Sequence, residues 1–219
     1  MLELKISNHR RAPDLILTTI YMIYTAMVVT SIVMFDELIT FKFLGFDIIL
    51  SGSIVPYVML YPLSFIVLRI YGSSAVNNMI GGMILGSLSF VLLSKVIVFF
   101  ASNTTEIDHI INTSMKMYVA GFLGMPAGIY GSFLCLSYLF RLGMSFNFIS
   151  LSIASVFGEI INTYIVFPFG FHGRLSFHTI FTNVILDAML FKIIAGIILS
   201  IVAMIVIRLI KIAYDRDWS

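Results

Sequence analysis

Four polar side chains are spaced so that one face of a single helix would carry them all. Ser152, Ser155, Glu159 and Asn162 follow one another at intervals of three, four and three residues, as neighbours on a helix surface do. The residues around them are largely apolar, which predicts a helix embedded in lipid. Because lipid does not solvate polar groups, this face must look toward protein, water or a ligand.

Lys192 is a second ionisable residue at predicted membrane depth. Glu159 lies about ten residues, or roughly 15 Å, from one end of its apolar segment, and Lys192 about eight residues, or roughly 12 Å, from the opposite end of the last segment. Both therefore lie near the middle of the bilayer, where adjacent antiparallel helices could bring them together. Two interpretations stay open: a structural ion pair that fixes helix register, and part of a solute site.

The chemistry of these groups suits recognition of a small polar solute. A carboxylate with an amide one turn away can accept hydrogen bonds from a ring N–H and an amino group, and a nearby lysine can donate one to a carbonyl. That arrangement fits a guanine-like base, and it also fits other small polar solutes.

No catalytic set accompanies these residues. The histidines all lie in flanks or breaks between apolar segments: His9, His109, His172 and His178. The chain shows no zinc-ligand pattern within an apolar segment, no glycine-rich phosphate loop and no basic patch with interleaved aromatic residues. We therefore expect a protein that is not an enzyme, uses no metal or cofactor and does not bind nucleic acid.

The composition places these residues in a membrane protein. Hydrophobic residues make up 60% of the 219 residues and charged residues 11%, and the mean hydropathy is +1.06. Soluble domains carry about 25% charged residues, so this chain has too few to cover a water-exposed surface. We expect the lipid bilayer to be its surroundings.

Six segments are long enough to cross a bilayer, which takes about 20 apolar residues. They span residues 15–35, 48–68, 79–101, 117–140, 149–169 and 184–210. Short polar breaks separate them, and no linker divides the chain, so residues 1–219 are predicted to form one all-α domain of six transmembrane helices. Pro56 and Pro62 should interrupt the second helix, because proline removes a backbone donor.

Lysine and arginine residues predict the orientation of the bundle. One side would carry Lys5, Arg10, Arg11, Arg69, Arg141, Arg208, Lys211 and Arg216, and the other Lys42, Lys116 and Arg174. Cytoplasmic loops hold the excess of these residues, so both termini are expected in the cytoplasm.

Four segments resemble those of the queuosine precursor transporters: "FLGFDIILSGSIVPY", "YPLSFIVLRIYG", "ASVFGEIINTYIVF" and "LDAMLFKIIAGIILSIV". That family belongs to the vitamin uptake transporter group and is similar to the substrate-binding components of energy-coupling factor transporters. The resemblance implies a six-helix transporter in the bacterial inner membrane. It also implies uptake of queuine and related deazaguanine bases, which cells salvage for tRNA modification.

The resemblance also implies site residues. Phe157 and Asn162 match the motif of the fifth helix, Lys192 matches the lysine of the sixth, and Arg69 matches the end of the second-helix motif. Glu159 stands where the family commonly has Gln or Asn, and Asn162 where it usually has Asp. Together with the spacing argument, this gives a predicted substrate site of Glu159, Asn162, Lys192, Ser155, Phe157 and Arg69.

Three alternatives to a self-sufficient queuosine precursor importer remain open. The chain could be a substrate-binding component that needs energising subunits, as in energy-coupling factor systems. It could be a divergent member that carries another small polar solute. It could also be a membrane scaffold that transports nothing, in which the Glu159–Lys192 pair is structural.

Overall fold

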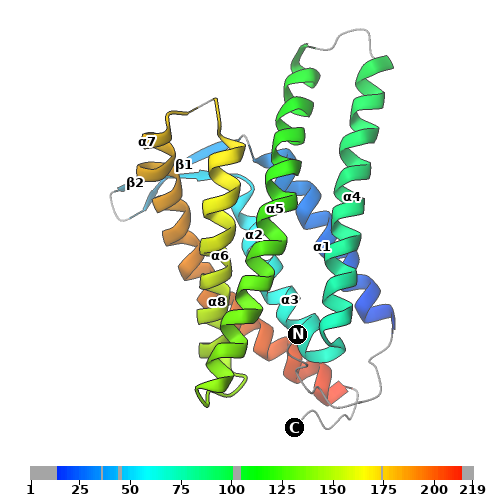
Figure 1. Ribbon diagram of the computed structural model, residues 1–219, viewed down its shortest axis with the longest axis vertical. Helices are drawn as coiled ribbons and strands as arrows, with labels where there is room; N and C mark the ends of the chain where they lie inside the picture. The colour runs from blue at the N-terminus through cyan, green and yellow to red at the C-terminus, as the bar shows by residue number, and fades with distance from the viewer. Residues whose placement is uncertain (1–13, 36, 44–45, 101–104, 174, 214–219) are drawn as a thin grey trace.

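The computed structural model describes residues 14–35, 37–43, 46–100, 105–173 and 175–213, and these residues form an all-α bundle with one small β-hairpin (Figure 1). Six helical segments are long and apolar enough to cross a membrane, as predicted. They are α1 (Asp14–Met34), α2 (Ile54–Val58) with α3 (Leu60–Tyr71), α4 (Ser73–Phe100), α5 (Thr105–Arg141), α6 (Phe148–Gly170) and α8 (Ile185–Ala213).

The bundle has two distinct ends. The start of α1 and the end of α8 lie together at the bottom of Figure 1, and we call this the terminal end. The strands β1 (Leu38–Phe43) and β2 (Phe46–Ser51) lie at the opposite end, the hairpin end. The short α7 (Phe177–Thr179) and the π-helical turn η1 (Ile180–Val184) lie between α6 and α8, on the hairpin side.

The β-hairpin corrects the predicted start of the second span. Residues 48–51, expected to be helical, belong to β2, which pairs antiparallel with β1 from Leu38 opposite Ser51 to Phe43 opposite Phe46. The two segments, "LITFKF" and "FDIILS", are rich in β-branched and aromatic residues, which favour strands. A short apolar run of this kind does not distinguish a strand from a helix by periodicity alone.

The predicted interruption of the second span is confirmed. Residue Met59 separates α2 from α3. Pro62 has no N–H to donate to the carbonyl of Val58, so the helical ladder loses a bond at this point. The next bond, from the Leu63 N–H to the Met59 carbonyl, measures 3.3 Å. Met59 itself keeps helical torsions, φ −76° and ψ −16°, so the interruption is local and α2 and α3 together form one span.

Three predicted breaks are shorter than expected. Gly72 alone separates α3 from α4, and its φ of 89° is a conformation that glycine adopts readily. Most of the predicted break at residues 102–114 is helical, because α5 begins at Thr105. In Figure 1, α4 and α5 extend beyond the other helices at the hairpin end. The break at residues 171–183 contains α7 and η1; the Ser176 hydroxyl caps α7 by accepting from the Thr179 N–H at 3.1 Å.

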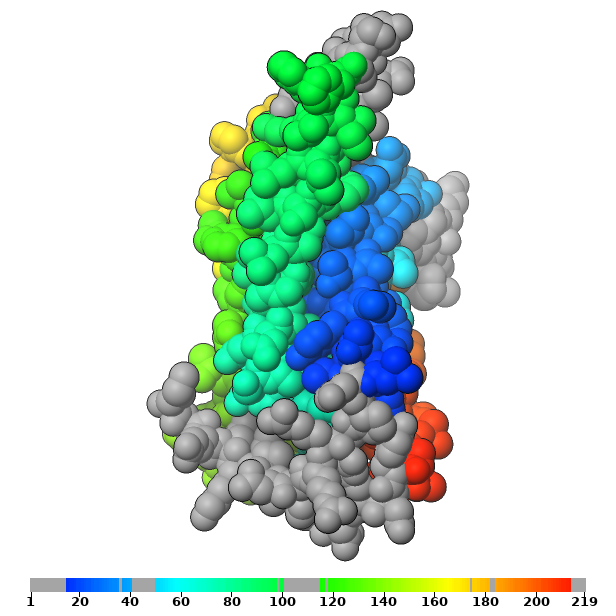
Figure 2. All heavy atoms as spheres, turned by 90° about the vertical axis from the view of Figure 1, so that its right-hand side faces the viewer, coloured from blue at the N-terminus to red at the C-terminus, as the bar shows by residue number. Residues whose placement is uncertain are grey.

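Small residues let α5 and α6 approach closely. Gly124, Gly128 and Gly131 of α5 are buried against α6, as small residues at helix interfaces in membranes often are. Gly82 on α4, in contrast, is exposed and has nothing within 4 Å of the position of a Cβ. Figure 2 shows α1 and α4 side by side on the outer face of the bundle, which is mostly apolar.

Candidate functional site

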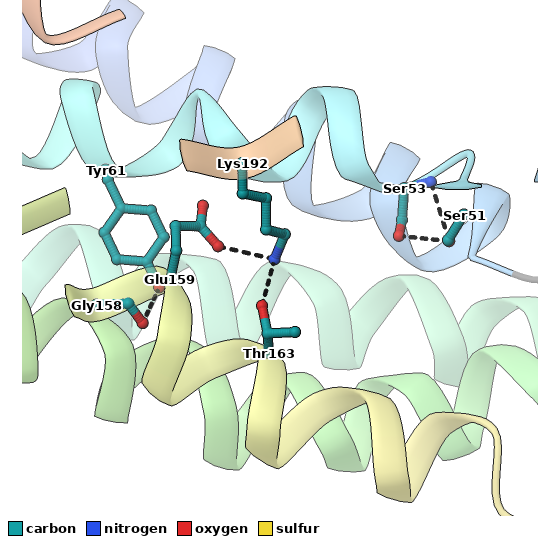
Figure 3. A network of polar contacts seen from close by, with 7 residues as sticks. All are labelled: Ser51, Ser53, Tyr61, Gly158, Glu159, Thr163 and Lys192. Atoms are coloured by element: carbon teal, nitrogen blue, oxygen red, sulfur yellow. Dashed lines mark hydrogen bonds and ion pairs between the residues drawn. The ribbon is translucent and has the colours of Figure 1, made fainter. Parts of the chain in front are cut away.

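A buried ion pair joins α6 to α8 in the middle of the bundle (Figure 3). Lys192 Nζ lies 2.8 Å from Glu159 Oε2 and donates a second hydrogen bond, 2.9 Å long, to Thr163 Oγ1. Glu159 is 1% and Lys192 2% exposed. The prediction that adjacent helices bring the two charged side chains together is therefore confirmed.

Two aromatic rings complete the surroundings of the ammonium group. Lys192 Nζ lies 5.7 Å from the ring centroid of Tyr57 and 5.5 Å from that of Phe167. Ammonium groups are attracted to aromatic ring faces at about 6 Å or less, more strongly where water is excluded. The charge of Lys192 is thus balanced by one carboxylate, one hydroxyl and two ring faces.

Three buried oxygen atoms beside the pair have no hydrogen-bond partner among the described residues: Ser155 Oγ, Glu159 Oε1 and Asn162 Oδ1. Ser155 Oγ faces Gly196, one turn after Lys192, and Asn162 Oδ1 faces Gly124 of α5. Buried acceptors are almost always paired in folded proteins, so a row of unpaired ones is unusual. These oxygens suit a solute that donates hydrogen bonds.

Three buried tyrosines surround the carboxylate, and none was predicted as a site residue: Tyr24, Tyr57 and Tyr61. The Tyr61 hydroxyl donates to the carbonyl of Gly158 at 3.0 Å (Figure 3), and the Tyr24 hydroxyl lies 3.6 Å from the sulfur of Met125.

The sequence holds a signal for two of these tyrosines. Ser53, Tyr57, Tyr61 and Ser64 are spaced at four, four and three residues, which is the same one-face pattern as on α6. All four side chains are buried. Thr163 is not among the predicted site residues, and the structure makes it the second acceptor of Lys192.

A narrow, nearly filled cavity leads from the ion pair toward the hairpin end. Its lining includes Ser53, Tyr57, Asn162, Phe167 and Lys192, and no part of it is wide enough for a water molecule. At its outer end the hydroxyls of Ser53 and Ser51 lie 2.8 Å apart, as Figure 3 shows. The helices are therefore closed around the pair.

Two of the predicted site residues are not brought to this cluster. Phe157 is 45% exposed on the outer surface of α6, because two residues turn a helix by about 200° and so place it away from Glu159. Arg69 lies in the last turn of α3, with its guanidinium carbon 5.1 Å from the ring centroid of Phe146. The structure does bring the other four predicted site residues together: Ser155, Glu159, Asn162 and Lys192.

Comparison of the chain with known protein families, with curated proteins and with solved structures finds no match. Among the described residues there is also no group of three or more His, Cys, Asp or Glu side chains that could hold a metal ion. The buried polar cluster is therefore the feature of this protein that bears on its function.

Proposed function

We propose that this protein is a bacterial inner-membrane transporter that takes up queuosine precursors, namely queuine and related deazaguanine bases. The observation that carries the proposal is the buried Glu159–Lys192 pair, flanked by unpaired acceptor atoms at the end of a cavity. Charged groups at the centre of a membrane helix are costly and mark solute or ion pathways in many transporters. The resemblance to the queuosine precursor transporters supplies the substrate class.

The acceptors match one edge of such a base. Glu159 and Asn162 are one helical turn apart, and Glu159 Oε1 and Asn162 Oδ1 have no hydrogen-bond partner among the described residues. The edge of a guanine-like ring that carries a ring N–H and an exocyclic amino group offers donors, which oxygen acceptors of this kind can bind. Lys192, in contrast, already donates to Glu159 and Thr163. The carboxylate side of the pair is thus the part that would bind the base.

Transport requires the helices around the cavity to separate, because the cavity is too narrow for a solute. The second span is the element suited to this movement: its backbone ladder lacks a bond at Pro62, and it contributes Tyr57 to the cavity wall. Broken helices at mid-membrane depth recur at transporter binding sites, where they allow one wall to move against the other.

Uptake of radiolabelled queuine by cells that express the protein tests the proposal. We expect uptake above that of cells with an empty vector, and its loss in the Glu159→Ala variant at equal protein abundance. Phe157→Ala is the matched control, since Phe157 is on the same helix and faces outward. No uptake by the unchanged protein contradicts the proposed substrate, and full uptake by Glu159→Ala contradicts the proposed site.

A second assay separates a self-sufficient transporter from a binding component. The purified protein is reconstituted in liposomes with labelled queuine outside. Accumulation inside supports an importer that works alone. Binding without accumulation, together with co-purification of an ATPase and a scaffold subunit, supports the energy-coupling factor arrangement.

A further inference from the structure

A surface groove lies where the hairpin-side ends of α5 and α6 meet the short helix α7 (Figure 1). It measures about 490 Å³, within the range of about 300–1,000 Å³ that pockets for small molecules occupy. Its lining is Lys116, Pro168, Phe169, His172 and Phe177. The groove is on the outer side of α6: Phe169 is 57% exposed, whereas Phe167, two residues earlier, faces Lys192.

The apolar wall of the groove is held in place by stacked aromatic rings. Phe177 is 60% exposed, and its ring stacks on that of Phe181 with 5.5 Å between the centroids. The Phe181 ring in turn lies 6.0 Å from that of Tyr164 on α6. The exposed ring of Phe177 is therefore supported from behind and does not fold into the groove.

The two polar residues of the groove lie at the boundary of the predicted hydrocarbon layer. Lys116 comes two residues before Tyr118, where the apolar span of α5 begins, and His172 comes two residues after Gly170, where that of α6 ends. Both side chains are exposed, and neither makes a hydrogen bond or ion pair with a described residue. No carboxylate is among the described residues that line the groove. This rim is thus at the level of the phospholipid headgroups.

The backbone beside His172 is anchored. The preceding residue, Phe171, is buried, with its ring centroid 4.6 Å from that of Phe35. The Phe171 carbonyl accepts a hydrogen bond from the Leu175 N–H at 3.3 Å, and Gly173 between them has a φ of 81°. This tight turn after α6 fixes His172 at the rim of the groove.

We propose that the groove binds one phospholipid with an anionic headgroup, from the leaflet on the hairpin side. The Lys116 ammonium pairs with the phosphate oxygens, and an imidazole N–H of His172 donates a hydrogen bond to them. The floor of Pro168, Phe169 and Phe177 takes the first part of an acyl chain. A zwitterionic headgroup brings its own cation toward Lys116, so an anionic one is favoured. The inference is independent of the solute that the protein carries.

Native mass spectrometry of the purified full-length protein in detergent tests the proposal. The protein is mixed with equal amounts of phosphatidylglycerol and phosphatidylcholine that have identical acyl chains, and the first bound lipid is identified by its mass. We expect about a fivefold or greater preference for phosphatidylglycerol, since one basic residue beside an anionic lipid contributes a factor of about this size.

Variants at the rim assign the preference to the groove. Lys116→Gln combined with His172→Gln should remove it, and Lys116→Arg, which keeps the charge, should retain it. Lys95→Gln is the matched control, because Lys95 is also an exposed lysine, on α4, and does not line the groove. It lowers the net charge as much as Lys116→Gln does and should leave the preference unchanged.

A variant of the floor tests the place of the acyl chain. Phe169→Ala removes apolar contact and should weaken both lipids about threefold or more while the preference remains. Phe157→Ala, an outward-facing position on the same helix outside the groove, should change neither lipid.

Three results would overturn the lipid site. They are equal binding of the two lipids to the unchanged protein, a preference that survives removal of both rim residues, and an equal loss of preference in Lys95→Gln, which would indicate a general effect of charge. Unchanged binding in Phe169→Ala would overturn the position of the acyl chain. All of these results leave the proposed transport function standing, because none of the measurements involves the solute.

Discussion

At the scale of single residues, the Glu159–Lys192 ion pair matters most for both stability and the proposed function. Taking two charges out of water is expensive, and their attraction offsets the cost only when hydrogen bonds satisfy the remaining groups. Lys192 meets that condition, through Glu159, Thr163 and two aromatic rings. Glu159 does not, because its Oε1 atom is buried without a partner. This asymmetry is the reason that we propose a binding role for Glu159 in place of a merely structural pair.

Single and paired substitutions should behave differently. Lys192→Met alone leaves a buried carboxylate unpaired and should destabilise the protein by about 3–5 kcal/mol. The double variant Glu159→Leu with Lys192→Met leaves no unpaired charge and should recover most of that stability. Thermal unfolding in detergent measures both variants.

The double variant also distinguishes the functional interpretation from the scaffold interpretation. We expect the double variant to fold and to lose queuine uptake, because it lacks the Glu159 carboxylate that would accept hydrogen bonds from the base. Normal uptake by a well-folded double variant would show that the pair is structural only.

Thr163 offers a milder test at the same scale. Thr163→Val keeps the shape of the side chain and removes one acceptor of Lys192, which should cost about 1–3 kcal/mol of stability. Thr163→Ser keeps the hydroxyl and should stay close to the unchanged protein. Equal unfolding temperatures for the Val and Ser variants would contradict the hydrogen bond from Lys192 to Thr163.

At the scale of elements, the contact between α5 and α6 depends on glycines. A Cβ placed at Gly128 would overlap the Tyr61 hydroxyl and lie 2.8 Å from the Gly158 carbonyl oxygen. The Tyr61 hydroxyl donates to that same carbonyl. Three elements, α3, α5 and α6, therefore meet at one point directly beside Glu159.

Gly128→Ala should consequently destabilise the bundle by about 1–3 kcal/mol, the usual cost of overfilling a packed interior. Gly82→Ala, at an exposed helical position, should be neutral or slightly stabilising, since alanine favours helix. The unfolding temperatures of the two variants give the comparison. A Gly128→Ala protein as stable as the Gly82→Ala protein would contradict the close packing.

Sequence patterns predicted the elements with uneven success, for physical reasons. Long apolar runs gave all six spans, because lipid leaves the backbone few alternatives to a helix. The hairpin was missed because "FDIILS" is apolar enough to extend a predicted span. Among the site residues, the face that contains Glu159 and Asn162 was predictable from spacing. The contributions of Tyr57 and Tyr61 required knowledge of how the second span packs against α6 and α8.

At the scale of the whole molecule, the orientation in the membrane is a prediction from charge. The terminal end carries Arg69, Arg141, Arg208 and Lys211 on described helices. The positive-inside rule therefore places this end in the cytoplasm. Cys135 is the one cysteine of the chain, so a cysteine-free background needs only Cys135→Ser.

Two single-cysteine variants in that background test the orientation. Ser74→Cys is exposed at the terminal end, and Glu37→Cys is exposed at the hairpin end. A membrane-impermeant maleimide applied to intact spheroplasts should label Glu37→Cys and leave Ser74→Cys unlabelled until the cells are lysed. The opposite pattern would reverse the orientation.

The one-residue turn at Gly72 ties the helices α3 and α4 of the bundle together. Its N–H donates to the carbonyl of Leu68 at 3.1 Å, and its own carbonyl accepts from the Val76 N–H at 3.4 Å, so hydrogen bonds continue from α3 into α4. Tyr61 on α3 donates to the Gly158 carbonyl beside Glu159. If the helices around the ion pair separate during transport, α3 and α4 are therefore expected to move as one unit.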